Sequence, residues 1–207
     1  MSNFHSDLNQ EQILSKYLDN IYKGKNIEFT RIFDLDMQHK GIDVIMVIQS
    51  DKYFIDEKAQ LHYIGKELPT FTFELSYLKN NSIRKGWLFD KEKLTQYYFL
   101  ITGIFLKKRI SILSKPDDIK KVKITSVNRK KLIAYLKSID LSEEKLLNYN
   151  NEIRNKNSFG KNTLSELNNK TEGLIYYSEH YTEKPINLQL RLKFLLETEV
   201  AKKFCYV

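Results

Sequence analysis

The chain has 207 residues, enough for one domain with a hydrophobic core, and 42% of them are hydrophobic while 29% are charged. This mixture, with only 7 glycines and 3 prolines, excludes a disordered or low-complexity chain. The net charge of +8 favours a polyanionic partner, either a nucleic acid or an anionic membrane surface, and a lysine-rich composition bias is the alternative.

The single cysteine and the hydropathy of the chain narrow the class further. Cys205 excludes an intramolecular disulfide and a zinc site built from cysteines. The N-terminal residues are polar and lack the apolar segment of a signal peptide. The longest apolar run, residues 97–106, is about half as long as the ~20 residues that a membrane-spanning helix needs. We therefore expect a soluble, cytoplasmic protein that does not enter a membrane.

The beginning of the chain predicts a helix followed by a strand. Apolar residues recur at helical spacing between residues 10 and 22, and Asn9 is a candidate N-cap. Glu11 lies in the first turn of this helix, where it either points towards a site or simply interacts with the helix dipole. Gly24 ends the helix, and residues 26–34 predict the first strand.

Two apolar runs, residues 42–48 and 53–59, predict a β-hairpin, because polar turn-forming residues separate them. Each run carries charge that a buried strand does not normally tolerate. The first run contains Asp43, and the second contains a DEK triplet that begins at Asp56. These charges make the hairpin the main candidate for a functional site.

The alternation of side chains along a strand groups these charges. Asp56, Lys58 and Gln60 share one face of the second strand, whereas Glu57 points away. The hairpin places Asp43 beside the shared face. Two carboxylates and an amine then converge at one edge of a sheet, where carboxylate oxygens suit Mg²⁺ and a lysine suits phosphoryl-transfer chemistry.

The rest of the chain predicts further strands and helices around the hairpin, and the polar segment 155–170 is expected to be a loop or a short helix. Ser142 is a candidate N-cap for the helix expected over residues 143–154. For the last helix, a strand is the alternative at its beginning. The expected strands are 70–78, 86–90, 97–105, 120–126, 174–180 and 184–190, and the expected helices are 128–138, 143–154 and 192–204.

Together these elements predict an α/β (α+β) fold, with a central mixed sheet of about five strands flanked by helices. We expect a single domain over residues 1–207, with a catalytic core over about residues 10–105. Residues 106–207 either complete the sheet or form a small specificity subdomain.

The spacing of the charged motif is similar to that of a known family. The sequence GID at residues 41–43 is followed, after twelve residues, by DEKAQ at residues 56–60. With a helix upstream, this pattern resembles the PD-(D/E)XK nuclease superfamily, which has the restriction-endonuclease-like fold. Ile42 stands where the family signature has proline. The resemblance covers roughly residues 10–105 and depends on few motif residues.

The resemblance implies a Mg²⁺-dependent endonuclease that cleaves DNA, of restriction, phage or mobile-element origin, with Mn²⁺ as a substitute ion. Asp43 and Asp56 would bind the ion, and the backbone carbonyl of Glu57 would complete its shell. Glu11 would be an outer ligand if its helix packs against the sheet. Many members of the family are homodimers.

The resemblance also implies roles for the remaining residues of the motif. Lys58 would orient or activate the attacking water, or neutralise the phosphorane. Gln60 would help to position Lys58 or the water. These two residues and the two aspartates form the expected catalytic set.

Three basic clusters would contact phosphates if they faced one side of the molecule, although each alone is typical of a solvated turn. Their nine residues are the expected nucleic-acid-binding positions. They are Lys79, Arg84 and Lys85; Lys107, Lys108 and Arg109; and Arg129, Lys130 and Lys131.

Two other interpretations of the chain stay open. The first is a catalytically inactive nucleic-acid-binding protein of the same fold. The second is a structural or partner-binding protein, in which the hairpin charges form a solvated surface pair that contributes little energy. Other chemistries have less support, because the 4 histidines lack zinc-ligand spacing and no nucleotide-binding or nucleophile-elbow motif is present.

Overall fold

The computed structural model describes residues 4–206, with side chains from Leu8 onward, and the chain divides into two compact units. Because strands of both units come from residues 10–105, the expected catalytic core draws on both of them. The first unit comprises the residues up to Leu68, residues 94–127 and the residues from Lys202 onward, and the second comprises residues 69–93 and 128–201.

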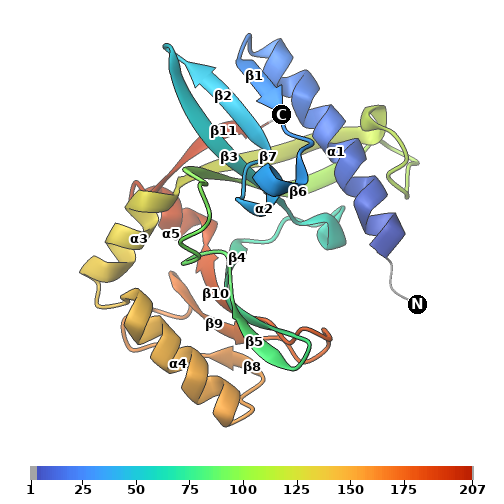
Figure 1. Cartoon of the computed structure of the whole chain (residues 1–207). Coiled ribbons are helices and arrows are strands. Elements are labelled where there is room, and N and C mark those ends of the chain that lie inside the picture. Colours follow the sequence, from blue (N-terminus) through green and yellow to red (C-terminus); the bar gives the residue numbers. More distant parts are fainter. Residues whose placement is uncertain (1–3, 207) are drawn as a thin grey trace. The chain divides into compact units, whose positions relative to one another are not determined.

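A six-stranded sheet forms the first unit (Figure 1). In spatial order its strands are β1 (Glu28–Arg31), β2 (Val44–Ile48), β3 (Asp51–Ala59), β6 (Tyr97–Leu106), β7 (Ile119–Asn128) and β11 (Ala201–Tyr206). The pairs β1–β2 and β2–β3 are antiparallel, whereas β3 and β6 are parallel. The sheet is therefore mixed, and with its flanking helices it confirms the predicted fold class.

The predicted hairpin is confirmed as β2 and β3. Its turn consists of Gln49 and Ser50, which have φ angles of 52° and 71°. Positive φ at both central residues is what a type I′ two-residue hairpin turn requires. The antiparallel ladder runs as far as the pair Val44 and Ile55. Asp43 therefore lies at the end of the ladder, next to the start of the DEK triplet.

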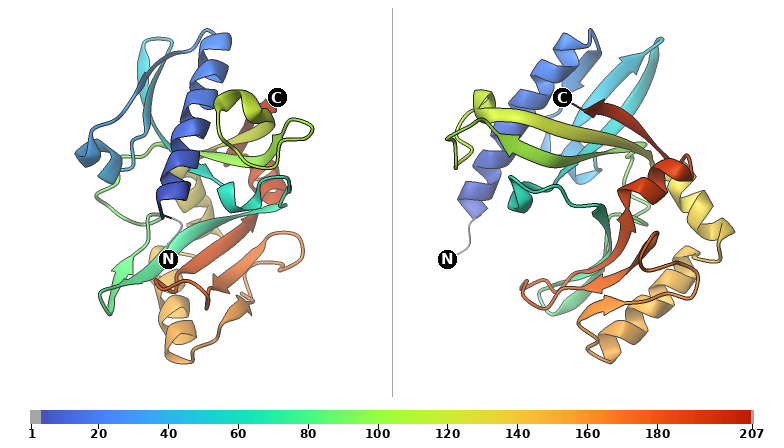
Figure 2. Two further views of the ribbon diagram at one scale, coloured as in Figure 1. Left: turned by 90° about the vertical axis from the view of Figure 1, so that its right-hand side faces the viewer. Right: turned by 180° about the vertical axis from the view of Figure 1, so that it is seen from behind.

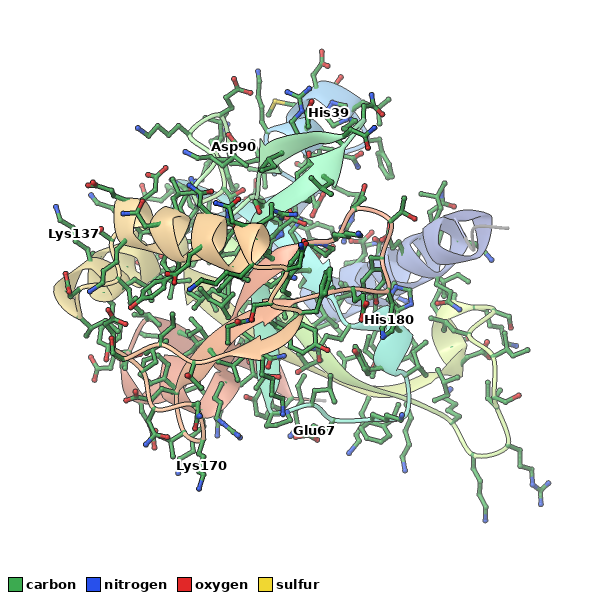
Figure 3. The ribbon with its side chains drawn as sticks, turned by 90° about the horizontal axis from the view of Figure 1, so that it is seen from below. His39, Glu67, Asp90, Lys137, Lys170 and His180 are labelled. Carbon is green, nitrogen blue, oxygen red and sulfur yellow. The ribbon has the colours of Figure 1, made fainter. Side chains whose placement is uncertain are left out.

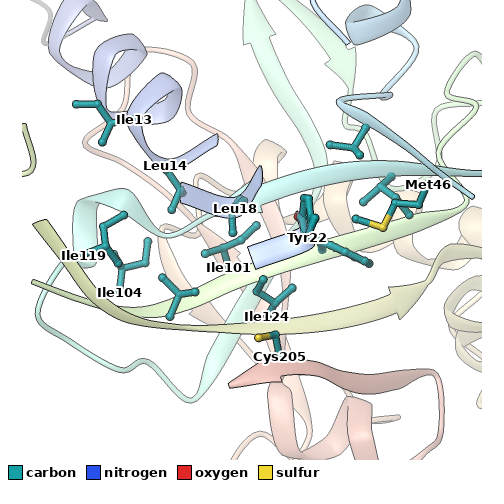
Figure 4. Close-up of a cluster of buried hydrophobic side chains, with 14 of the residues drawn as sticks. Ile13, Leu14, Leu18, Tyr22, Met46, Ile101, Ile104, Ile119, Ile124 and Cys205 are labelled. Carbon is teal, nitrogen blue, oxygen red and sulfur yellow. The ribbon is translucent and has the colours of Figure 1, made fainter. Parts of the chain in front are cut away.

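Helix α1 (Phe4–Gly24) covers one face of this sheet (Figure 4). The helix predicted for residues 10–22 is confirmed, but it begins earlier, so Asn9 lies inside it and is not its N-cap. Apolar side chains at helical spacing bury against those of the central strands, which stabilises the layer. They include Ile13, Leu14, Leu18 and Tyr22 from the helix and Val44, Met46, Ile55, Phe99, Ile101, Ile104 and Ile124 from the strands.

Short elements complete the first unit. They are α2 (Leu35–His39) between β1 and β2, and the two 3-10 turns η1 (Leu61–Tyr63) and η2 (Pro116–Asp118). Of the helices in residues 4–206, none combines the length and the apolar character that a membrane crossing requires.

The second unit is built on a five-stranded antiparallel sheet (Figures 1 and 2). Ser142 caps one of its helices by accepting a hydrogen bond from the Lys145 N–H at 3.2 Å, as predicted. The strands in spatial order are β5 (Ser82–Lys85), β4 (Thr70–Lys79), β10 (Ile186–Arg191), β9 (Gly173–Tyr177) and β8 (Gly160–Asn162), and the helices are α3 (Arg129–Ser138), α4 (Glu143–Asn155) and α5 (Leu192–Glu197).

The prediction for residues 86–90 is wrong. The strand that pairs with β4 is β5, because Asn80 and Asn81, with φ angles of 51° and 57°, make a two-residue turn and start the return strand early. Residues 86–90 then form a loop with turns.

The expected C-terminal helix over residues 192–204 is also wrong in its second half. The helix α5 ends at Glu197, and Glu199 has a φ of 57°, which ends helical geometry. The chain continues as β11, so the last apolar residues belong to a strand of the first unit. The segment 155–170, expected to be a loop or a short helix, contains the short strand β8.

Candidate functional site

Asp43 is positioned by the connection between α2 and β2. The side chain of Asp34 caps α2 by accepting a hydrogen bond from the Met37 N–H at 2.9 Å. Gly41 follows the helix with a φ of 74°, in the left-handed region that glycine adopts without strain. The Asp43 N–H then donates to the Ile55 carbonyl at 2.9 Å. These bonds fix Asp43 at the entry to β2.

Asp56 and Lys58 lie on one face of β3 and form an ion pair. The Lys58 Nζ is 2.7 Å from Asp56 Oδ1. Asp56 is only 2% exposed. The backbone N–H of Glu57, between them, donates to Asp43 Oδ2 at 2.7 Å. The structure therefore brings the three expected residues of the hairpin together and joins them through the backbone of β3.

The pKa of Asp43 is changed by this arrangement. Burial, followed by the negative charge of Asp56, raises the pKa of Asp43 to about 7, although Lys58 and the Glu57 N–H favour its charged form. The nearby negative charge of Asp56 disfavours the ionised form of Asp43. A bound divalent cation stabilises the ionised form of both. The pair is thus electrostatically suited to hold a cation.

The side chain of Glu57 lies on the opposite face of β3, against α1 and β1. It accepts hydrogen bonds from Arg31 Nη1 and from the Tyr22 hydroxyl, both at 2.5 Å. Arg31 also donates from Nη2 to Asp19 Oδ1 at 2.5 Å. Burial raises the pKa of Glu57, although Arg31 and Tyr22 stabilise its charged form. This network ties the central strand to the edge strand and the helix.

Sequence reasoning missed this network. It assigned Glu57 at most a backbone role, and it named neither Arg31 nor Asp19. A signal was present, because Arg31 and Glu57 are charges of opposite sign within neighbouring apolar segments. Which strands would pair could not be inferred from that signal alone.

A cleft of about 720 Å³ opens within the first unit, lined by α1, the β1–α2 connection and β3. Asp43, Lys58 and Glu11 line it, so Glu11 lies on the cleft that contains the two hairpin residues. Acidic and basic groups are nearly balanced in the lining, although the whole chain has a net charge of +8. The acidic residues are Glu11, Asp19, Asp43 and Glu57, and the basic residues are Lys16, Arg31 and Lys58.

The donors present fit a hard cation that keeps several water ligands. Among the described residues, no group of three or more His, Cys, Asp or Glu side chains is placed to hold a metal ion. Asp43 and Asp56 supply two carboxylates, and Mg²⁺ is commonly bound by one or two carboxylates with water completing its shell. The backbone carbonyl of Glu57 and the side chain of Glu11 stay predicted additions to this set.

Asp56 is also absent from this cleft lining, as are the remaining predicted residues. Gln60 follows β3, and its N–H donates to the Ile101 carbonyl at 3.0 Å. His39, at the end of α2, and His180, between β9 and β10, belong to different units (Figure 3).

The three basic clusters are divided between the units. Arg129 donates to the carbonyls of Leu88, Asp90 and Lys93, so its guanidinium holds the loop before β6 in place. Lys85 forms an ion pair with Glu143. The exposed members are Lys79, Arg84, Lys85, Lys130 and Lys131 in the second unit and Lys107, Lys108 and Arg109 in the first.

Comparison with known proteins found no matching family model, no matching curated protein and no matching solved structure. The resemblance to the PD-(D/E)XK nuclease superfamily therefore stays a prediction, and it depends on residues 41–43 and 56–60.

Proposed function

We propose that the protein is a Mg²⁺-dependent endonuclease that hydrolyses phosphodiester bonds of DNA, with Asp43, Asp56 and Lys58 at its catalytic centre. The observation that carries the proposal is the convergence of these two carboxylates and one amine on the hairpin, where Asp43 and Lys58 line the cleft. The net charge of +8 on the whole chain supports a polyanionic substrate. The candidate cation site and the positive net charge together support a metal-dependent reaction on nucleic acid. Neither property alone supports it as well.

Each residue has a distinct task in this proposal. Asp43 and Asp56 would hold the ion, which lowers the pKa of a bound water and offsets charge that develops on the phosphate. Lys58 places a positive charge beside the carboxylates, where it attracts the phosphate and orients the water. The Glu57 N–H fixes the direction of Asp43 Oδ2. Asp43 must lose its proton before it binds a cation.

Nicking of supercoiled plasmid in Mg²⁺, Mn²⁺ or EDTA tests the proposal. We expect cleavage in both ions and none in EDTA, and a loss of at least about a hundredfold in Asp56→Ala and Lys58→Ala. Asp51→Ala and Lys52→Ala are matched controls, because they change the same residue types at the exposed far end of β3. Undiminished nicking by Asp56→Ala or Lys58→Ala contradicts the proposal.

DNA binding at several salt concentrations separates this function from its alternatives. Binding that weakens with salt but yields no products in either ion indicates a catalytically inactive nucleic-acid-binding protein. An absence of binding at physiological salt indicates that the basic charge is a bias of composition.

A further inference from the structure

Phe33 is an exposed aromatic side chain on the rim of the cleft. It is 83% exposed, and Leu35, two residues later, is 67% exposed. Both line the same cleft as Asp43 and Lys58. Single exposed apolar residues are common on protein surfaces, and Ile112, which is 72% exposed in the first unit, lies outside this lining. The cleft lining thus includes charged side chains and two strongly exposed apolar ones.

The backbone around Phe33 is held by hydrogen bonds. The N–H of Ile32 donates to the Asp43 carbonyl at 2.9 Å, and Gln38 Nε2 donates to the Ile32 carbonyl at 3.0 Å. Asp34, on the other side of Phe33, caps α2. Phe33 therefore directly follows the residue that is bonded to Asp43. An exposed ring on a fixed segment is preorganised for a ligand, because little conformational entropy is lost on binding.

We propose that Phe33, flanked by Leu35, forms a stacking subsite for a nucleobase beside the phosphate that is cleaved. This inference rests on the proposed function and defines its substrate more closely. A ligand that brings a phosphate to Lys58 and a flat apolar face to Phe33 has the chemistry of a nucleotide. Base–aromatic stacking tolerates any sequence, because every base has a π-face.

The subsite selects for unpaired bases. Inside a duplex, the neighbouring base pairs cover both faces of each base, so an aromatic ring reaches only a base that is terminal, displaced or single-stranded. The preferred substrate is therefore single-stranded DNA, or a duplex with a single-stranded tail.

Binding of fluorescent oligonucleotides tests the subsite. The probes are a single strand, the same strand in a blunt duplex, and the duplex with a single-stranded tail. All proteins carry Asp56→Ala, which prevents cleavage under the proposed function and retains Lys58, and all are measured in Mg²⁺. We expect tighter binding of the single strand and the tailed duplex than of the blunt duplex. Adding Phe33→Ala should weaken single-strand binding roughly tenfold, whereas Phe33→Trp should preserve it.

A stacking signature distinguishes this role from a structural one. A 2-aminopurine base in the single strand should lose emission when it stacks on the protein, and Phe33→Ala should restore that emission. Ile112→Ala is the control, because it removes an equally exposed apolar side chain of the same unit that lies outside the cleft lining. We expect this control to change neither affinity nor emission.

The outcomes separate the two proposals. If Phe33→Ala matches Ile112→Ala in affinity and emission, or if the blunt duplex binds best, the subsite is overturned, and plasmid nicking by the wild-type protein still supports the nuclease. If none of these proteins binds any of the three probes at low salt, the subsite is overturned, and an absence of plasmid nicking by the wild-type protein overturns the nuclease as well.

Discussion

The second unit buries Ser76 and Asn150 against each other, whereas the first unit buries Asp56 and Glu57 next to Asp43. In the second unit, the Ser76 hydroxyl donates to Asn150 Oδ1 at 2.6 Å, and Arg154 Nη2 donates to the Ser76 hydroxyl oxygen at 2.7 Å. The other described partners of Arg154 are also neutral: the Tyr177 ring and hydroxyl and the Lys184 carbonyl. Hydrogen bonds thus satisfy Ser76 and Asn150, whereas the buried Nε of Arg154 has no hydrogen-bond partner among the described residues.

Burial of the polar groups in the first unit costs more free energy, because these groups include carboxylates. Burying an ionised carboxylate is unfavourable unless it is paired and hydrogen-bonded, and Glu57 meets that condition through Arg31 and Tyr22. Asp43 meets it only partly, because burial and Asp56 raise its pKa to about 7 despite the nearby Lys58. Perturbed carboxyl groups of this kind cluster at functional sites. The contrast locates the candidate chemistry in the first unit.

Removal of the Arg31 side chain should give the largest effect, because it upsets the charge balance among the partly buried side chains of the first unit. Arg31→Ala leaves Glu57 and Asp19 without their cation, and we expect a loss of about 3–5 kcal/mol in the free energy of unfolding. Urea titration followed by hydrogen exchange measures this loss in each unit separately. A loss no larger than that of an ordinary surface substitution contradicts the proposal that Arg31 offsets the cost of burying these carboxylates.

Two features make the Arg31 experiment specific. Trp87, the only tryptophan, lies in the second unit, so its fluorescence follows that unit. The double variant Arg31→Met, Glu57→Gln removes both charges together and should recover part of the lost stability. If the double variant is less stable than Arg31→Ala, isolated charge is not the cause.

A smaller effect is expected from the hydrogen-bond network around Ser76 in the second unit. Ser76→Ala removes one acceptor and one donor and leaves Asn150 and Arg154 each short of a partner. We expect a loss of about 1–3 kcal/mol, measured by urea titration of Trp87 fluorescence. Ser138→Ala, at an exposed helix end of the same unit, is the control and should stay within about 0.5 kcal/mol of the wild type. Equal losses in both variants would remove the distinction between buried and exposed hydroxyls.

The predicted hairpin shows what local sequence determines. Alternation and turn chemistry locate two strands and assign each side chain to a face, because a strand has a period of two. Asp43, Asp56 and Lys58 therefore come together from local information alone. The hairpin alone places these three residues close together, without contacts from distant segments.

The division into two units needs information that alternation does not contain. β3 pairs with β6 in the first unit, while β4 and β5, which lie between them in the chain, belong to the other sheet. A strand pattern does not specify the partner strand. The same limit hid the partners of Glu57, because Arg31 and Tyr22 meet it only through the packing of β1 and α1.

The smallest expected effect is a change of a few degrees in the melting temperature. It depends on pH through the carboxyl group of Asp43. The pKa of Asp43 is about 7 in the folded chain and near its ordinary value, about 4, in the unfolded chain. Between these values the folded state holds a proton that the unfolded state releases, so without metal Asp43 lowers the stability as the pH rises from about 4 to about 7. Mg²⁺ favours the deprotonated carboxylate, and its stabilising effect should grow over the same interval.

Melting temperatures measured with and without Mg²⁺ at pH 5 and pH 8 check this. We expect a rise of roughly 2–4 °C at pH 8 and almost none at pH 5, since ligand binding of about 1 kcal/mol shifts a chain of this size by that amount. Asp43→Asn should abolish the rise, whereas Asp51→Asn, in the exposed part of the same hairpin, should retain it. Glu57, whose pKa is also raised by burial, keeps its contribution in both variants, so their difference belongs to Asp43. A Mg²⁺ shift that is equal at both pH values, or that persists in Asp43→Asn, would mean that the buried carboxylates of the first unit are structural like the polar groups of the second.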